Sequence, residues 1–123
     1  MRVLYITDNQ IDLCFVIDRS QSIGADNWKL LLNFVENIVN KLTISNNDTR
    51  FALVTFASFG ELVFGLDVFN NNTSGLIEAI RSADYYGYGT SIDNGLYTAR
   101  TECFYKVYIY IYIYIYILYI YNY

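Results

Sequence analysis

The stretch DLCFVIDRSQSIG, residues 12–24, decides the fold, because an apolar segment in it runs directly into a polar cluster. Residues 11–17 are mostly apolar and are bounded by polar residues, a pattern typical of a strand buried on both faces of a parallel sheet. The cluster that follows contains one carboxylate, Asp18, and two hydroxyls, Ser20 and Ser22, at steps of two. The first question is therefore what these oxygens do where a buried strand ends.

Helical and strand-like patterns alternate after this stretch. From Asp26, apolar residues recur at three- and four-residue steps as far as Leu42, which predicts a helix with Asp26 as its N-cap. The segment TRFALVTFAS, residues 49–58, predicts a second buried strand, and FGELVFGL, residues 59–66, predicts a turn and a third strand paired with the second as a hairpin. One helix therefore connects the first strand to the second, and a tight turn connects the second strand to the third.

The next segment predicts two helices with a glycine-rich loop between them. The first begins near Thr73 or Ser74, whose hydroxyls are expected to cap it, and the second spans residues 92–104. The loop at residues 87–90 contains two glycines, which allow unusual backbone angles. The order of elements predicts a doubly wound, Rossmann-like α/β fold, in which sites form at the carboxyl ends of parallel strands.

Composition excludes several classes of function. The 123 residues suffice for one domain, and 54% are hydrophobic with a net charge of −4. The eight Lys and Arg are scattered, so nucleic acid is not expected as a partner. No histidine is present, which excludes histidine triads and histidine-ligated zinc. Cys14 and Cys103 lack CxxC spacing, which leaves two buried thiols or a single disulfide as the alternatives.

The C-terminal segment, residues 105–123, has a different character. It holds nine of the fourteen tyrosines in a Tyr-Ile alternation, the sequence that a TA dinucleotide repeat encodes when translated. A membrane span is not expected, because the apolar run of 15 residues at 107–121 is shorter than the roughly 20 that a helix needs. The alternation has the period of a strand. We therefore divide the chain into a domain at 1–104 and a low-complexity tail at 105–123.

The polar cluster has two interpretations. Asp18, Ser20 and Ser22 can turn three oxygens toward one point, and oxygen ligands suit a hard divalent cation, Mg²⁺, Ca²⁺ or Mn²⁺. With one negative charge among the ligands, such a cation should seek a further carboxylate, which a partner protein's Asp or Glu could supply. Alternatively Ser20, Ser22 and Asp26 only cap the first helix. The three residues alone do not separate these alternatives.

Three motifs together resemble the von Willebrand factor type A domain, a module of extracellular adhesion proteins. DLCFVIDRSQSIG is similar to the family's first strand and the start of its metal-ion-dependent adhesion site, TRFALVTFAS to its second strand, and GYGTSIDNGL to the loop with its site threonine. The segment RTECF is closest to collagen and matrilin-type members. The resemblance implies Asp18, Ser20, Ser22 and Thr90 as metal ligands, whereas we expect Asp93 to cap the third helix.

The chain also departs from the family pattern. Arg19 and Gln21 occupy positions where the family often has small residues, and the family's later site Asp, which follows its fourth strand, has no counterpart. The resemblance implies an incomplete domain with three strands and three helices, in which one edge of the first strand is open. We predict that the Tyr-Ile tail lies along this edge as an extra strand. Metal binding should be weak because one Asp is missing.

The function that these patterns favour is metal-dependent protein binding of the adhesion or matrix type, without catalysis. Family resemblance implies an extracellular location, although residues 1–10 contain no apolar core of a signal peptide. One alternative is a non-functional product of a gene model that reads into a TA repeat. Another is a Mg²⁺-dependent phosphoryl-transfer enzyme with Asp18 as nucleophile, which would need a second carboxylate where Ser20 stands.

Overall fold

The computed structural model describes residues 11–85, 87–104 and 113–118. Within these ranges the strands are β1 (Ile11–Asp18), β2 (Thr49–Phe56), β3 (Gly60–Phe64) and β4 (Ile113–Leu118). The helices are α1 (Ala25–Asn40), α2 (Thr73–Arg81), α3 (Ile92–Thr98) and a π-helical turn, η1 (Ala99–Cys103). These elements confirm the predicted order of strands and helices up to residue 104.

The four strands form one sheet in the order β3-β2-β1-β4. β1 and β2 run parallel from the pair Ile11 and Thr49 to the pair Asp18 and Phe56, so both strands end at the same edge. β3 pairs antiparallel with β2, with an irregularity between Leu53 and Val54, which confirms the predicted hairpin. Both predicted buried strands therefore occupy the centre of the sheet.

β4 comes from the Tyr-Ile tail and lies along β1. It pairs parallel with β1 on the edge opposite β2, from Ile113 beside Asp12 to Leu118 beside Ile17. Both edges of β1 are thereby hydrogen-bonded, and an open strand edge is covered. The predicted placement of the tail is confirmed for these residues, while the rest of the tail lies outside the described residues.

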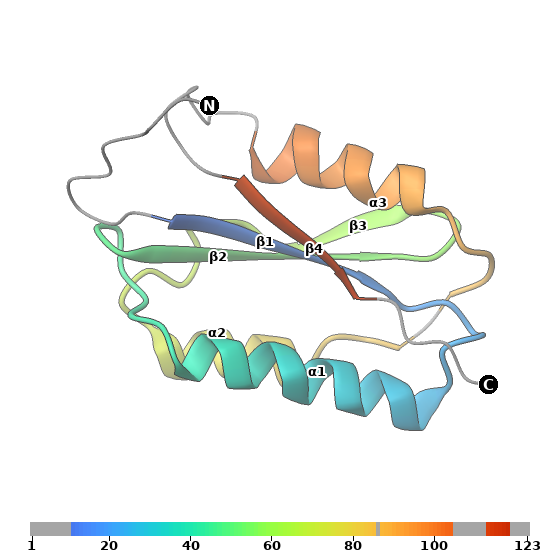
Figure 1. The fold of residues 1–123 in the computed structure, drawn as a ribbon, viewed down its shortest axis with the longest axis horizontal. Coiled ribbons are helices and arrows are strands. Elements are labelled where there is room, and N and C mark those ends of the chain that lie inside the picture. The colour runs from blue at the N-terminus through green and yellow to red at the C-terminus, as the bar shows by residue number, and fades with distance from the viewer. Residues whose placement is uncertain (1–10, 86, 105–112, 119–123) are drawn as a thin grey trace.

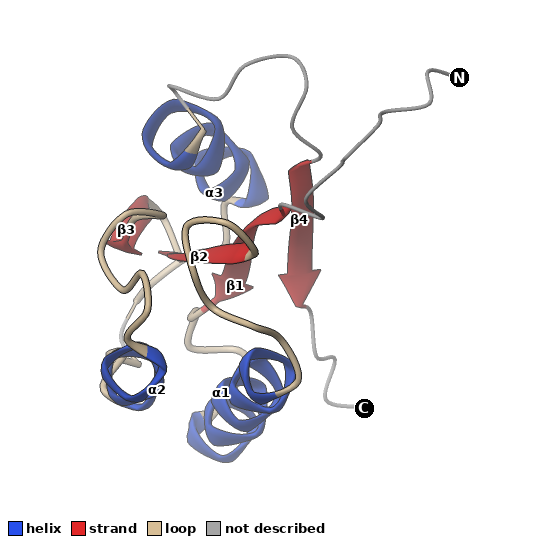
Figure 2. Cartoon of the chain, turned by 90° about the vertical axis from the view of Figure 1, so that its left-hand side faces the viewer, coloured by secondary structure: helices blue, strands red, loops and turns tan. Residues whose placement is uncertain are grey.

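Helices cover both faces of the sheet, as Figures 1 and 2 show: α1 and α2 lie on one face, and α3 lies on the other. Because side chains alternate along a strand, β1 serves both layers. Leu13, Phe15 and Ile17 pack into the cluster that contains the apolar stripes of α1 and α2. Cys14 and Val16 pack into a second cluster with Ala99, Cys103 and Phe104, among others. The structure is thus a three-layer α/β/α arrangement.

Two helix starts differ from the sequence predictions. α1 begins at Ala25, and Gly24 (φ 85°) is its N-cap, so the prediction of Asp26 as the N-cap is wrong. Asp26 lies inside the first turn, where its negative charge interacts favourably with the helix dipole. α2 is capped by Asn72, whose side chain accepts a hydrogen bond from the backbone N–H of Gly75. The prediction of Thr73 or Ser74 as caps is therefore wrong by one or two residues.

The third predicted helix is split. It begins after Ser91 at the N-cap, and Asp93 lies in its first turn without a capping hydrogen bond, so the predicted role of Asp93 as a cap is wrong. The α-helical part ends at Thr98, and the chain continues directly into the π-helical turn η1. The π-helical turn changes the direction of the last side chains, and Cys103 and Phe104 become buried against the sheet.

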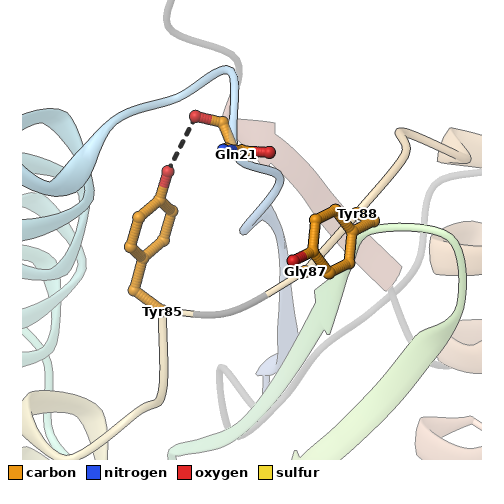
Figure 3. A pocket seen from close by; sticks show the side chains of 4 residues that line it. All are labelled: Gln21, Tyr85, Gly87 and Tyr88. Carbon is orange, nitrogen blue, oxygen red and sulfur yellow. Dashed lines mark hydrogen bonds between the residues drawn. The ribbon is translucent and has the colours of Figure 1, made fainter.

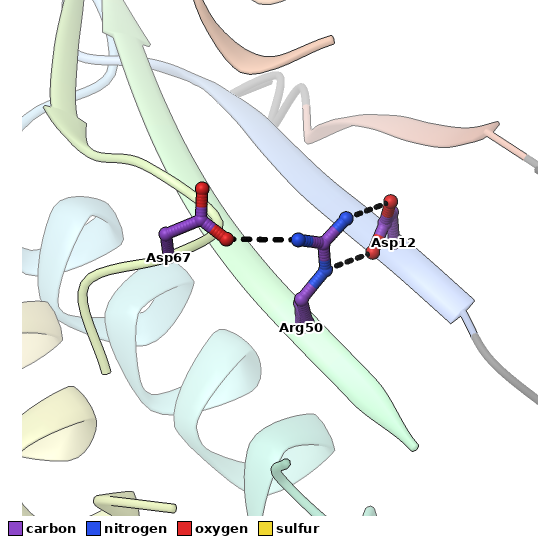
Figure 4. A network of polar contacts seen from close by, with 3 residues as sticks. All are labelled: Asp12, Arg50 and Asp67. Carbon is purple, nitrogen blue, oxygen red and sulfur yellow. Dashed lines mark hydrogen bonds and ion pairs between the residues drawn. The ribbon is translucent and has the colours of Figure 1, made fainter. Parts of the chain in front are cut away.

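An ion-pair network fixes the amino-terminal end of the central strands (Figure 4). Asp12, which is buried in β1, accepts two hydrogen bonds from the Arg50 guanidinium on β2, at 2.7 and 2.6 Å. Arg50 also contacts Asp67 at 2.8 Å. The hydrogen bond to Asp12 raises the pKa of Arg50, so the guanidinium stays charged. A buried carboxylate is tolerated here because its charge is paired.

Gly95 sets the distance between α3 and the sheet. A Cβ at this buried position would lie 2.7 Å from Phe56 Cδ1 and 3.0 Å from Val16 Cγ1. In an open helix Gly→Ala would stabilise by about 1 kcal/mol, but here the methyl group has no space. We expect Gly95→Ala to lower the free energy of unfolding by about 1–3 kcal/mol in urea denaturation.

Gly65→Ala is the matched control for this prediction. No atom lies within 4 Å of a Cβ at Gly65, and its backbone is outside the left-handed region. This variant should keep the wild-type stability within about 1 kcal/mol. A Gly95→Ala protein more stable than wild type would show that α3 does not pack on β1 and β2 as described.

Candidate functional site

Asp18 is delivered to the carboxyl end of the sheet by β1, and its side chain is fully buried. One carboxylate oxygen, Oδ1, accepts a hydrogen bond from the backbone N–H of Ser20 at 2.7 Å. The other oxygen, Oδ2, is buried without a hydrogen-bond partner among the described residues. A buried carboxylate oxygen without a partner is costly, so this position calls for a positively charged group or a donor.

Ser20 and Ser22 lie side by side next to this carboxylate. Their hydroxyl oxygens are 2.9 Å apart, with Ser20 buried and Ser22 exposed. The three predicted ligands of the D-x-S-x-S pattern therefore extend from the buried end of β1 to the surface. The spacing of two residues brings the two serine hydroxyls together, and Asp18 contacts this turn through the backbone N–H of Ser20.

The alternative interpretation, that the serines cap α1, does not fit the structure. The N-cap of α1 is Gly24, and no side chain caps the helix. The Ser20 hydroxyl is instead 2.9 Å from that of Ser22, and the Ser20 carbonyl accepts a hydrogen bond from Ile23. The hydroxyls are thus not used by the helix and remain available to a ligand.

Tyr85 holds the turn between β1 and α1 in place (Figure 3). Its hydroxyl accepts a hydrogen bond from the Gly24 N–H at 2.9 Å and lies 3.0 Å from the carbonyl oxygens of both Ser20 and Gln21. The ring packs against Trp28, with the centroids 5.6 Å apart. One residue from the segment after α2 therefore fixes the backbone that carries two candidate ligands.

A small pocket of about 170 Å³ opens beside this turn, as Figure 3 shows. It is lined by Gln21, Tyr85, Gly87 and Tyr88. Gln21 is exposed at its rim and does not fill the turn. The turn and the glycine-rich loop therefore share one concave surface next to the hydroxyl cluster.

The glycine-rich loop packs directly on the end of β2. A Cβ at Gly87 would lie 2.3 Å from Ala57 Cβ, and one at Gly89 would lie 2.4 Å from Ser58 Oγ. Gly89 also has a φ of 73°, a conformation that residues with a side chain rarely adopt. Both glycines are required for the loop to approach the strand this closely.

Hydrogen bonds anchor the loop on both sides of Thr90. The Gln21 N–H donates to the Gly87 carbonyl at 3.1 Å, and the Ser91 N–H donates to the Ala57 carbonyl at 2.7 Å. Thr90 lies exposed between these two anchors. The structure thus places Gly87 of this loop against the D-x-S-x-S turn, and among the described residues no hydrogen bond joins Thr90 to the serines.

Arg19 lies between the ligands in sequence but its charge is directed to β3. Its guanidinium forms an ion pair with Glu61 at 2.9 Å, and its backbone N–H donates to the Phe56 carbonyl at 2.8 Å. A positive charge beside a cation site would weaken cation binding, and the ion pair reduces this effect. The charge of Arg19 is therefore partly balanced by Glu61.

Sequence reasoning missed the residues that hold the site together. Tyr85 was not distinguished from the other tyrosines. Ser58 donates to the Tyr88 carbonyl, and the Asn94 amide donates to the Ser58 carbonyl at 2.8 Å. No sequence motif identifies these residues, because each acts on a backbone group far away in the chain. Of the residues that hold the site together, only the glycines of the loop could be identified from the sequence, because they predict unusual backbone angles there.

These features define a doubly wound α/β domain with an oxygen-lined site outside the carboxyl ends of its parallel strands. In the described parts of the chain, no group of three or more His, Cys, Asp or Glu could hold a metal ion. The candidate site is not a group of this kind, because it contains one carboxylate and its other proposed ligands are hydroxyl groups. No helix in the described ranges is long and apolar enough to cross a membrane.

The chain belongs to the von Willebrand factor type A domain family, whose family model matches residues 12–108. It is 36% identical to mouse vitrin over 98 residues, which is 80% of this chain and 15% of vitrin. Mouse matrilin-3 is 31% identical over 94 residues, covering 76% of this chain and 19% of matrilin-3. The chain thus spans less than a fifth of the length of these relatives.

Solved structures agree with the assignment. Proximal thread matrix protein 1 from the mussel byssus, in a structure with a zinc-occupied MIDAS motif, superimposes with a TM-score of 0.78 at 30% identity. The match covers 94% of this chain and 30% of that protein. The predicted family and the α/β fold are therefore confirmed.

The Tyr85 hydroxyl provides a test of how the site is held. Tyr85→Phe keeps the ring on Trp28 but removes the hydrogen bonds to the turn. We expect a loss of about 1 kcal/mol in the free energy of unfolding, measured by urea denaturation. Tyr97→Phe, which removes a hydroxyl from an exposed tyrosine on α3, should change it by less than about 0.5 kcal/mol. Equal effects of the two variants would contradict the role of Tyr85.

Proposed function

We propose that this domain binds a protein partner through a divalent cation held by Asp18, Ser20, Ser22 and Thr90. The observation that carries the proposal is the buried Asp18 carboxylate, whose Oδ2 has no hydrogen-bond partner among the described residues. Its Oδ1 accepts from the backbone N–H of Ser20, whose hydroxyl lies 2.9 Å from that of Ser22. A bound cation would satisfy Oδ2. The cation would be Mg²⁺, Ca²⁺ or Mn²⁺, since all the donors are oxygens.

The charge of the site supports a role in binding acidic groups. Asp18 is the only carboxylate among the four proposed ligands, so a divalent cation would keep a net positive charge there. Such a cation supplies Lewis acidity and an open coordination position. A carboxylate from an Asp or Glu of a protein partner is the group that fits this position. The four side chains hold and orient the cation, and no catalytic residue is assigned.

The relatives support the biological setting of the proposal. One matching structure is named as a thread matrix protein, and its MIDAS motif holds zinc. Vitrin and matrilin-3 contain a domain similar to this one. We propose an extracellular location and a role in adhesion or matrix assembly for this domain. With one carboxylate among the four proposed ligands, we expect weak binding, in which Mg²⁺ completes its shell with water.

Replacement of Asp18 tests the metal site directly. Asp18→Asn keeps the shape of the side chain and the oxygen that accepts from Ser20 but removes the charge. We expect Mg²⁺ or Mn²⁺ affinity, measured by titration calorimetry, to fall at least about 10-fold. The matched control is Asp26→Asn, an exposed carboxylate in the first turn of α1 that should leave affinity unchanged. Equal binding heats for wild type and Asp18→Asn would exclude the proposed site.

Thr90 contributes through a separate loop and is tested separately. Thr90→Ala removes one exposed hydroxyl and leaves the anchors at Gly87 and Ser91 in place. We expect a smaller loss of Mn²⁺ affinity, about 3- to 10-fold, because a water molecule can replace the hydroxyl. Thr73→Ala on α2, also exposed, serves as the control. If Thr90→Ala binds like the control, Thr90 is not a ligand and the site is limited to the β1 turn.

A further inference from the structure

The two cysteines of the chain meet in the interior on the α3 face of the sheet. Cys14 is in the middle of β1 and fully buried, and Cys103 is the last residue of η1 and almost fully buried. Their sulfur atoms are 2.8 Å apart although the residues are 89 positions apart in sequence. Two sulfurs that are not bonded normally stay farther apart than this. Both side chains are thiols in this structure.

The surroundings of the pair are apolar. The same cluster contains Val16, Ala52 and Val54 from the strands and Ala99 and Phe104 from the η1 segment. The sequence contains two cysteines and no histidine, so it does not supply the four Cys or His ligands of a structural zinc site. A catalytic role is also excluded by burial, because no substrate can reach either sulfur. Two alternatives remain, a packed pair of thiols and a disulfide, and the short distance between the sulfurs favours the disulfide.

We propose that Cys14 and Cys103 form an intramolecular disulfide in the mature domain, which ties η1 to the centre of β1. The reaction is an exchange with a small-molecule or enzyme disulfide. Two thiols lose two protons and two electrons to form the Sγ–Sγ bond, and the oxidant is reduced to two thiols. An extracellular domain, as proposed above, would meet such oxidants during secretion. The disulfide itself follows from the contact of the sulfurs and does not require the metal site.

The environment also indicates when the bond forms. The hydrogen bond with Cys103 and burial both raise the pKa of the Cys14 thiol well above its usual range. The thiolate is the species that attacks a disulfide, so oxidation of the folded domain by an external disulfide is slow. Reduction of the bond is slow as well, because both sulfurs are buried and a reductant cannot reach them. The bond should therefore form while β1 and η1 are still assembling. Once formed, it is protected from reductants.

The position of the bond matters for the rest of the structure. α3 and η1 follow directly after the Thr90 loop, and η1 ends at Cys103. A bond to Cys14 fixes the end of this segment to the strand that carries Asp18. It also closes a very long loop in the unfolded chain, the case in which a disulfide restricts the unfolded state most. The disulfide thus holds together the two segments that supply the proposed ligands.

The test uses the full 123-residue chain refolded in a buffer of oxidised and reduced glutathione. After denaturation and treatment with iodoacetamide, the intact mass should show no alkylated cysteine, and a digest should contain a peptide linked through Cys14 and Cys103. The melting temperature should fall by roughly 10 °C or more when the protein is reduced under denaturing conditions and refolded. Folded reduced protein should be oxidised at least about 10-fold more slowly than unfolded protein.

Variants separate the covalent bond from simple packing. The double variant Cys14→Ala, Cys103→Ala should melt at the same temperature with and without reductant, whereas the wild type should not. Alkylation of both cysteines after refolding would overturn the proposal, as would disulfide-linked dimers on a non-reducing gel. So would a wild-type melting temperature that does not respond to reduction. The mass measurement on the wild type decides the question even if the double variant does not fold.

Discussion

The structure depends on the burial of β1 on every side. β1 is hydrogen-bonded to β2 on one edge and to β4 on the other, and its side chains alternate between two apolar clusters under opposite helix layers. A strand in this position cannot shift its register by one residue without exchanging the two faces. Its two acidic ends are therefore fixed in space: Asp12 in the ion pair with Arg50, and Asp18 at the opposite end.

This constraint explains the character of the candidate site. Asp18 is held in a buried position by the strand, and the turn after it is held by Tyr85 and by the glycine-rich loop. The backbone around the site is thus hydrogen-bonded to Tyr85 and Gly87 on one segment and to Phe56 at the end of β2. A preorganised set of oxygens loses little freedom when it binds a cation. Among the residues that the structure describes, one carboxylate oxygen of Asp18 is left without a partner, which a structural role alone does not explain.

The tail shows how tolerant strand pairing is. A Tyr-Ile alternation repeats every two residues, so a slip of two residues along β1 would recreate the same pattern of side chains. Residues 113–118 nevertheless occupy the free edge of β1, because backbone hydrogen bonding and an apolar character satisfy the requirements of that edge. The low complexity of the tail and its place in the sheet are compatible for this reason.

The sequence by itself determined the strands, the helical segments, the hairpin, the D-x-S-x-S cluster and the family, because each rests on a short-range pattern. Apolar runs predict buried strands and three- and four-residue steps predict helices, wherever they lie in the chain. Even the use of the tail as a strand followed from its period and from an open edge at β1. For the candidate site, the spacing from Asp18 to Ser22 identified the one turn that carries three of the proposed ligands.

Only the tertiary structure decided the features that depend on distant partners. Gly24 and Asn72 occupy the N-caps where Asp26, Thr73 and Ser74 were equally plausible locally, and η1 interrupts a helix that the sequence predicts as continuous. Tyr85 and the contact between Cys14 and Cys103 join residues far apart in the chain. Such contacts exist because packing brings the segments together, and no pattern within either segment encodes the partner.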